Sequence, residues 1–288
     1  MRAAAPLMLG LLVGLGACGG GPAQSVAERR LDSALRVARL DFQAGRYEQA
    51  AAAFAVAEDA AWQLDDAEAI ATAGAERALS LLRDDRPAEA LSVSQRLAGE
   101  LARRGDPPSP LATLVLGAAE IAQGQFADAR TTLRPLLEHP DERIWTRAWY
   151  LLGLEAAERA DRGDLEAAIA GLAPTALPLA VADRQELEAR LALLGGRPTA
   201  ALDALAEVRA ARRGLDDLVG LGEALALSGR AAEAAGEPIV AGDFYLRAAR
   251  SAAVQGRIGR AEAWLEAAER LAGASLAPAI AEVRERLG

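Results

Sequence analysis

The sequence predicts an all-α protein, an α-solenoid in which antiparallel helix pairs follow one another along the chain. Hydrophobic residues make up 52% of the sequence and aromatic residues only 4%. The apolar content is mostly Ala and Leu, which favour helices, and runs rich in β-branched or aromatic residues are few, so no strand is expected. Apolar residues recur every three or four positions between glycine-containing turns. A single helix pair cannot bury both of its faces, so each pair requires neighbours.

Residues 111–140 show this pattern most clearly. They predict two amphipathic helices joined by a tight turn at residues 123–125. Small residues stand where the two helices must cross closely, namely Gly117 and Ala118 in the first helix and Ala129 in the second. The larger apolar residues supply a buried stripe. The segment therefore predicts one helical hairpin of a repeated stack.

The same turn recurs along the chain. A glycine is followed by a small residue five positions later and by a bulky apolar residue four positions beyond that. The copies are Gly45-Ala50-Phe54, Gly124-Ala129-Leu133, Gly163-Ala168-Leu172, Gly196-Ala201-Leu205 and Gly256-Ala261-Leu265, with a weaker one at Asp85-Ala90-Ser94.

Segments such as GRYEQAAAAFAVA, GQFADARTTLRPL and LATLVLGAAEIAQG resemble the tetratricopeptide repeat (TPR). The resemblance covers most of Val26 to Leu287. It implies that residues 26–288 form a TPR-like right-handed superhelix of about seven antiparallel helix pairs. The expected helices are 26–44 and 47–62, 65–83 and 86–104, 110–123 and 126–138, 141–161 and 165–172, 178–195 and 198–212, 215–235 and 238–255, and 257–272 and 276–287. Beyond Gly214 two registers of the repeat match equally well.

The resemblance also implies a concave groove, lined by the first helix of each pair, that takes a protein or peptide partner. Carried over position by position, the groove residues are Arg39, Leu114, Ala118, Tyr150, Ala157 and Arg190. The middle of this surface is apolar and small, whereas the two arginines stand toward its ends. One hypothesis is that an apolar segment docks there with its carboxylates on the arginines. The alternative is that the small residues only permit tight packing of the superhelix.

Residues 1–17 predict an export signal, since Arg2 precedes an apolar run from about Leu7 to Leu15 that is too short to span a bilayer. LGAC, ending in Cys18, resembles the lipobox of bacterial lipoproteins. That resemblance implies cleavage before Cys18, lipidation of its sulfur and acylation of its amine, for example with palmitate. Residues 18–25 would then be a lipidated tether. An ordinary secretory signal with a chance cysteine is the alternative.

Several function classes are disfavoured by residue counts. Lys is absent, which excludes a phosphate-binding or Schiff-base lysine, and His139 is the only histidine, which excludes histidine metal clusters and Ser-His-Asp triads. The net charge of −9 disfavours nucleic acid. The acidic pairs Asp65-Asp66, Asp84-Asp85 and Asp216-Asp217 predict helix capping. We expect no catalytic residue, no cofactor and no metal.

The sequence thus predicts a non-catalytic scaffold, anchored by lipid in a bacterial cell envelope. If the organism has two membranes, Gly19 after Cys18 resembles the default signal for the outer membrane, facing the periplasm. A solute-, peptide- or glycan-binding lipoprotein that uses the concave groove is the alternative. An enzyme would require a convergent polar cluster and a deep pocket with perturbed carboxylates.

Overall fold

A computed structural model describes residues 24–287, in which thirteen α-helices and one 3₁₀ turn follow one another without a strand. The helices are α1 Val26–Gln43, α2 Tyr47–Leu64, α3 Ala67–Arg83, α4 Pro87–Arg104, α5 Pro110–Ala122, α6 Phe126–Leu133, α7 Glu142–Glu158, α8 Arg162–Leu172, α9 Pro178–Leu194, α10 Pro198–Gly214, α11 Leu218–Ala234, α12 Pro238–Val254 and α13 Ile258–Leu287. The predicted export signal, Cys18 and most of the tether lie outside the described residues.

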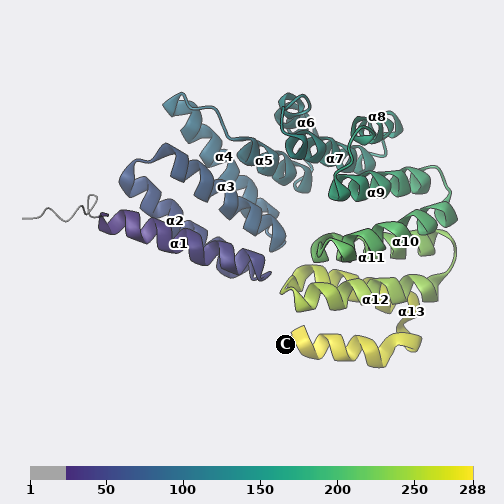
Figure 1. Ribbon diagram of the computed structural model, residues 1–288. Coiled ribbons are helices and arrows are strands. Elements are labelled where there is room, and N and C mark those ends of the chain that lie inside the picture. Colours follow the sequence, from purple (N-terminus) through teal and green to yellow (C-terminus); the bar gives the residue numbers. More distant parts are fainter. Residues whose placement is uncertain (1–23, 288) are drawn as a thin grey trace, which may run out of the picture.

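Consecutive helices pack against each other as pairs, and the pairs follow a curve (Figure 1). From α3 to α11, each odd-numbered helix contacts the odd-numbered helix before or after it in the series α3, α5, α7, α9 and α11, so these five helices form one continuous layer. The predicted all-α, TPR-like solenoid is confirmed. Because α11 contacts α9 in this layer, α11 is the first helix of its pair, which resolves the register beyond Gly214.

Most predicted helix ends agree with the structure to within three residues. The expected helix 126–138 is an exception, because α6 ends at Leu133 and the chain continues as a 3₁₀ turn over Arg134–Leu136. Pro135 lies in this turn. Proline lacks the backbone N–H that an α-helix needs there, and its ring crowds the carbonyl four residues earlier.

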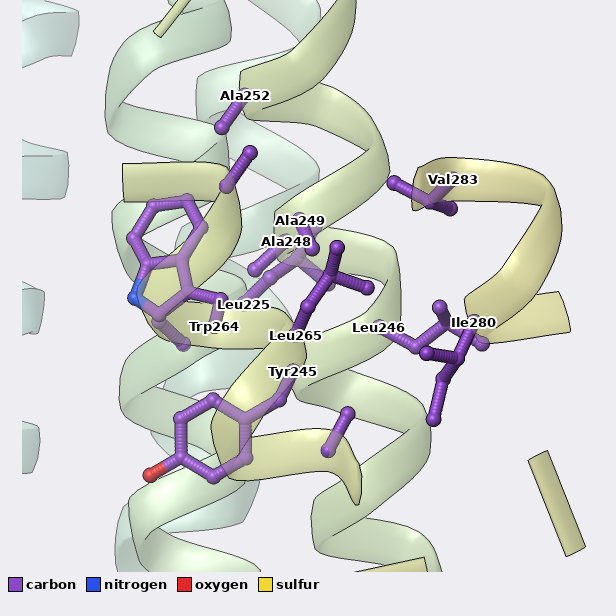
Figure 2. Packing of buried hydrophobic residues seen from close by; sticks show 13 residues of the cluster. Leu225, Tyr245, Leu246, Ala248, Ala249, Ala252, Trp264, Leu265, Ile280 and Val283 are labelled. Carbon is purple, nitrogen blue, oxygen red and sulfur yellow. The ribbon is translucent and has the colours of Figure 1, made fainter. Parts of the chain in front are cut away.

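The last predicted pair is present as one long element with a break. In α13 the backbone leaves the helical region at Ala272, with φ −139° and ψ 21°. The second half then turns back on the stack, and Ile280 and Val283 pack with Leu246 and Leu265 in the terminal hydrophobic cluster (Figure 2). This half buries an apolar face that α12 would otherwise expose.

Close helix crossings depend on small residues, as the sequence predicted. Ala129 is completely buried. A β-carbon on Gly117 of α5 would lie 2.6 Å from the Cγ of Leu133 in α6, which is itself completely buried. The two helices can therefore approach this closely only because residue 117 has no side chain.

The curve brings distant parts of the chain together. Nη2 of Arg260, near the start of α13, lies 3.3 Å from Oδ1 of Asp85, in the turn between α3 and α4. Figure 1 shows the purple and blue helices of the N-terminal part and the yellow-green helices of the C-terminal part approaching each other across the opening. None of the described helices combines the length and apolar character needed to span a bilayer.

Candidate binding site on the inner face

A cavity of about 530 Å³, which we name the central cavity, lies on the layer of odd-numbered helices. We call this layer the inner layer. Helices α3, α5 and α7 supply most of the lining of the cavity, and Val219 of α11 and Arg257 line it from the C-terminal part of the curve. Its apolar lining residues are Leu79, Leu82, Leu111, Leu114, Val115, Ala118, Leu151, Leu154 and Val219. Its volume falls in the range of about 300–1,000 Å³ that small-molecule sites occupy.

The charged lining of the central cavity is entirely basic: Arg83, Arg143, Arg147 and Arg257. Three of these arginines have a carboxylate partner outside the lining. Nη2 of Arg143 lies 3.1 Å from Asp141, Nη1 of Arg147 3.5 Å from Asp183, and Nη2 of Arg257 3.0 Å from Glu223. Within residues 24–287, Arg83 has no ion-pair partner.

The four guanidinium groups differ in burial, since the side chain of Arg143 is 81% exposed and that of Arg257 only 4%. Arg257 is 4% exposed, and its Nε and Nη1 atoms have no hydrogen-bond partner in residues 24–287. Burial lowers the pKa of Arg83; Arg147 and Arg257 lower it further, while Tyr47 and Asp217 act in the opposite direction. A buried donor without an acceptor is costly, and clustered like charges repel. An anion placed in the cavity would relieve both effects.

The predicted groove residues divide between this cavity and other places. Leu114 and Ala118 of α5 line the central cavity. Arg39 of α1 lies apart from it, with its guanidinium 3.0 Å from the carboxylate of Glu76 and half of its side chain exposed. An external carboxylate would have to compete with Glu76 for Arg39.

Tyr150, Ala157 and Arg190 lie together between α7 and α9 rather than in the central cavity. Burial raises the pKa of Tyr150 well above its usual value, and Glu186 and Asp183 raise it further. Ala157 packs in the same hydrophobic cluster as Tyr150. Arg190 donates to Glu186 at 2.9 Å, and its side chain is 15% exposed. Arg190 is thus already paired with a carboxylate of its own helix.

Sequence reasoning missed the buried ionic network that surrounds Arg190. Arg212 of α10 is its centre, and its nitrogens lie 2.6 Å from Asp183, 3.0 Å from Glu186 and 2.7 Å from Asp217. Arg147 and Arg190 bring the basic members to three, against three carboxylates. Each of these carboxylates is bonded to a guanidinium, while the buried Nε of Arg212 has no hydrogen-bond partner in residues 24–287. We interpret it as structural.

A signal for this network is visible in α9. Asp183 and Glu186 are three residues apart and therefore share a helix face, and Arg190 follows Glu186 by four. Both acids are almost completely buried. Acids on the buried face of a helix need basic partners from neighbouring helices. The charged pattern of α9 could therefore have indicated that basic partners are needed, but not which residues of other helices supply them.

The acidic pairs near helix ends have two different roles. Asp66 and Asp217 accept hydrogen bonds from the N–H groups of Ala69 and Gly220 at 3.0 Å, as predicted for caps. Asp65, Asp85 and Asp216 instead adopt left-handed backbone conformations, with φ of 51°, 59° and 53°. They stand at turn positions where other repeats have glycine. Asp84 is the C-cap residue of α3, and its carboxylate accepts a hydrogen bond from Arg86 at 3.4 Å.

The remaining candidates are isolated. Nδ1 of His139 accepts a hydrogen bond from the N–H of Asp141 at 3.0 Å. Across residues 24–287, no group of three or more His, Cys, Asp or Glu side chains is arranged to hold a metal ion.

No family model and no curated protein matches this chain. Among solved structures, the crystal structure of a tetratricopeptide repeat protein from Parabacteroides merdae is similar, with a TM-score of 0.49 and 12% sequence identity. The match covers 90% of this chain and 99% of that one. The likeness concerns the overall arrangement of helices and assigns no role to any residue.

Proposed function

We propose that this chain is a non-catalytic interaction scaffold, tethered by a lipidated Cys18 to a membrane of the bacterial cell envelope. The continuous inner layer of the solenoid carries the proposal. Stacked helix pairs give an extended, curved surface that is larger than a small molecule needs, and such surfaces are used to bind other proteins. The apolar start of the sequence and the position of Cys18 support the membrane tether.

In an organism with two membranes we propose the outer membrane, with the helical domain facing the periplasm, because Gly19 rather than Asp follows Cys18. The tether between Cys18 and α1 is short, since its seven residues reach roughly 25 Å when fully extended. The scaffold would therefore work close to the membrane surface, on partners that are themselves in or near that membrane.

The test compares the wild-type chain with a Cys18→Ser variant in the native host. Labelled palmitate and membrane fractionation report lipidation, and chemical crosslinking in intact cells followed by purification reports the partner. We expect the label, the membrane association and a defined crosslinked partner for the wild type. The Cys18→Ser variant should lose the first two. Label on the variant, or a wild-type chain that leaves the membrane fraction without detergent, would contradict the anchored scaffold.

The central cavity supports a second candidate, the solute-binding lipoprotein. Its volume suits a small molecule, and its lining combines apolar and basic side chains. A lipoprotein of this kind would hold its ligand on the inner face and need no partner protein for binding.

A further inference from the structure

We propose that the central cavity binds a small organic anion in which a carboxylate is joined to an aliphatic tail. The proposal concerns a ligand site and goes beyond the scaffold role. Four features of the cavity support it, namely the sign of its charge, its unpaired donors, its aliphatic lining and its size.

The charge of the residues that line the central cavity is opposite in sign to the net charge of the whole protein. The chain carries a formal charge of −9, yet four arginines and no acidic residue line the central cavity. Three of these arginines are paired with carboxylates that do not line the cavity, namely Asp141, Asp183 and Glu223. The fourth, Arg83, is within the field of Asp217 but forms no ion pair in the described part of the chain. The cavity therefore presents a net positive surface, which favours an anion.

Unpaired donors give the anion a place to bind. Arg257 uses Nη2 for Glu223, while its buried Nε and Nη1 atoms have no acceptor in residues 24–287. Each of these N–H groups can donate to one carboxylate oxygen, and a hydrogen bond to an ionised acceptor is stronger than one between neutral groups. Arg83 lines the same cavity from the opposite part of the curve. Together they can hold one carboxylate between the N-terminal and C-terminal parts of the solenoid.

The rest of the lining defines the other part of the ligand. Side chains of α5 and α7 that face the cavity, including Leu114, Val115 and Leu154, are aliphatic, and no aromatic side chain is among the lining residues. Such a surface favours an alkyl chain over a sugar or a nucleobase, which pack best on aromatic rings.

The size of the cavity suits a small ligand. At about 530 Å³ it lies within the range of about 300–1,000 Å³ that small-molecule sites occupy, which is ample for a single aliphatic chain with its carboxylate.

The test is calorimetric titration of the purified full-length chain with decanoate. Decan-1-ol and decyltrimethylammonium serve as matched uncharged and cationic probes. We expect saturable, one-to-one binding of decanoate that is at least tenfold tighter than that of either control. Equal binding of the cationic probe would overturn the proposal, as would binding of a pentapeptide with a free carboxy-terminal leucine in the absence of decanoate binding.

Variants locate the site. Arg83→Gln should weaken decanoate binding at least tenfold, and because Arg83 has no ion-pair partner in the described residues, this change should leave the fold intact. Ala118→Phe should fill the cavity and abolish binding. Arg284→Gln, which removes an arginine from an exposed pair with Glu269, is the matched control and should bind as the wild type does. Wild-type affinity in both cavity variants would overturn the assignment. The crosslinking test of the scaffold is independent of these titrations, so the two proposals can fail separately.

Discussion

At the scale of single residues, the absence of a side chain at Gly117 allows two helices to pack in contact. The adjacent Leu133 is completely buried, so it has little room to move away from a new β-carbon. Gly99, by contrast, has room for a side chain. It lies on an exposed face of α4, and the only atom within 4 Å of its β-carbon position is 3.8 Å away, on Arg103. The same substitution at these two glycines should therefore have opposite effects.

We predict that Gly117→Ala lowers the free energy of unfolding, because overpacking costs about 1–3 kcal/mol and outweighs the gain in helix propensity. Gly99→Ala should raise it by about 1 kcal/mol, since only the propensity changes. Urea unfolding followed by circular dichroism at 222 nm measures both. A stabilised Gly117→Ala protein would show that α5 and α6 do not approach as closely as described.

The residue patterns predicted the helices and their turns. They did not predict which of the groove residues line the central cavity. Leu114 and Ala118 line the central cavity, since their positions in α5 follow from the repeat. Tyr150 and Arg190 also follow the repeat. They nevertheless lie outside the cavity, where Arg190 pairs with Glu186 of its own helix α9 and Glu186 also pairs with Arg212 of α10. A pattern within one repeat carries no information about such partners.

At the scale of elements, the ionic network joins α9 to α10. Burial alone would raise the pKa of Glu186, but Arg190 and Arg212 outweigh it and hold that pKa below its usual value. A lowered pKa means that Glu186 contributes stability above about pH 4.5, and that this contribution is lost as the pH falls through the folded-state pKa. Removing Arg212 would reverse this balance.

We predict that Arg212→Met destabilises the protein by about 3–5 kcal/mol at pH 7, because buried carboxylates lose their partner. The pKa of Glu186 should then lie above that of the unfolded chain. The penalty should therefore shrink as the pH is lowered from 7 toward 4.5, where the carboxylate takes up a proton. Urea unfolding of both proteins across this range measures the difference.

Arg284→Met provides the control for that prediction. Its partner Glu269 is 51% exposed, and an exposed pair of this kind contributes about 0–1 kcal/mol. An Arg212→Met variant no less stable than Arg284→Met would mean that the network between α9 and α10 does not bear on stability.

At the scale of the whole molecule, the small rotation from each helix pair to the next determines how far the solenoid curves. These rotations accumulate along the stack. Their sum places Asp85 beside Arg260 and brings Arg83 and Arg257 to one cavity. Sequence reasoning predicted the stack but could not predict the cavity, because no single repeat determines the accumulated rotation. The central cavity is a property of the complete curve.

The contact between the two parts of the curve can be measured directly by crosslinking. A β-carbon on Gly259 would lie 3.4 Å from Oδ2 of Asp85. Cys18 is the only cysteine of the chain, so Asp85→Cys and Gly259→Cys in a Cys18→Ser background introduce a unique pair. Single-cysteine variants control for crosslinks between molecules.

Because the two parts of the curve meet at Asp85 and Arg260, we expect a short bismaleimide at low protein concentration to give an efficient crosslink within one molecule. Mass spectrometry of the joined peptides identifies this crosslink. The contrary result is that both cysteines react with a monofunctional maleimide but crosslink only between molecules. It would contradict the contact between the two parts of the curve, and with it the central cavity.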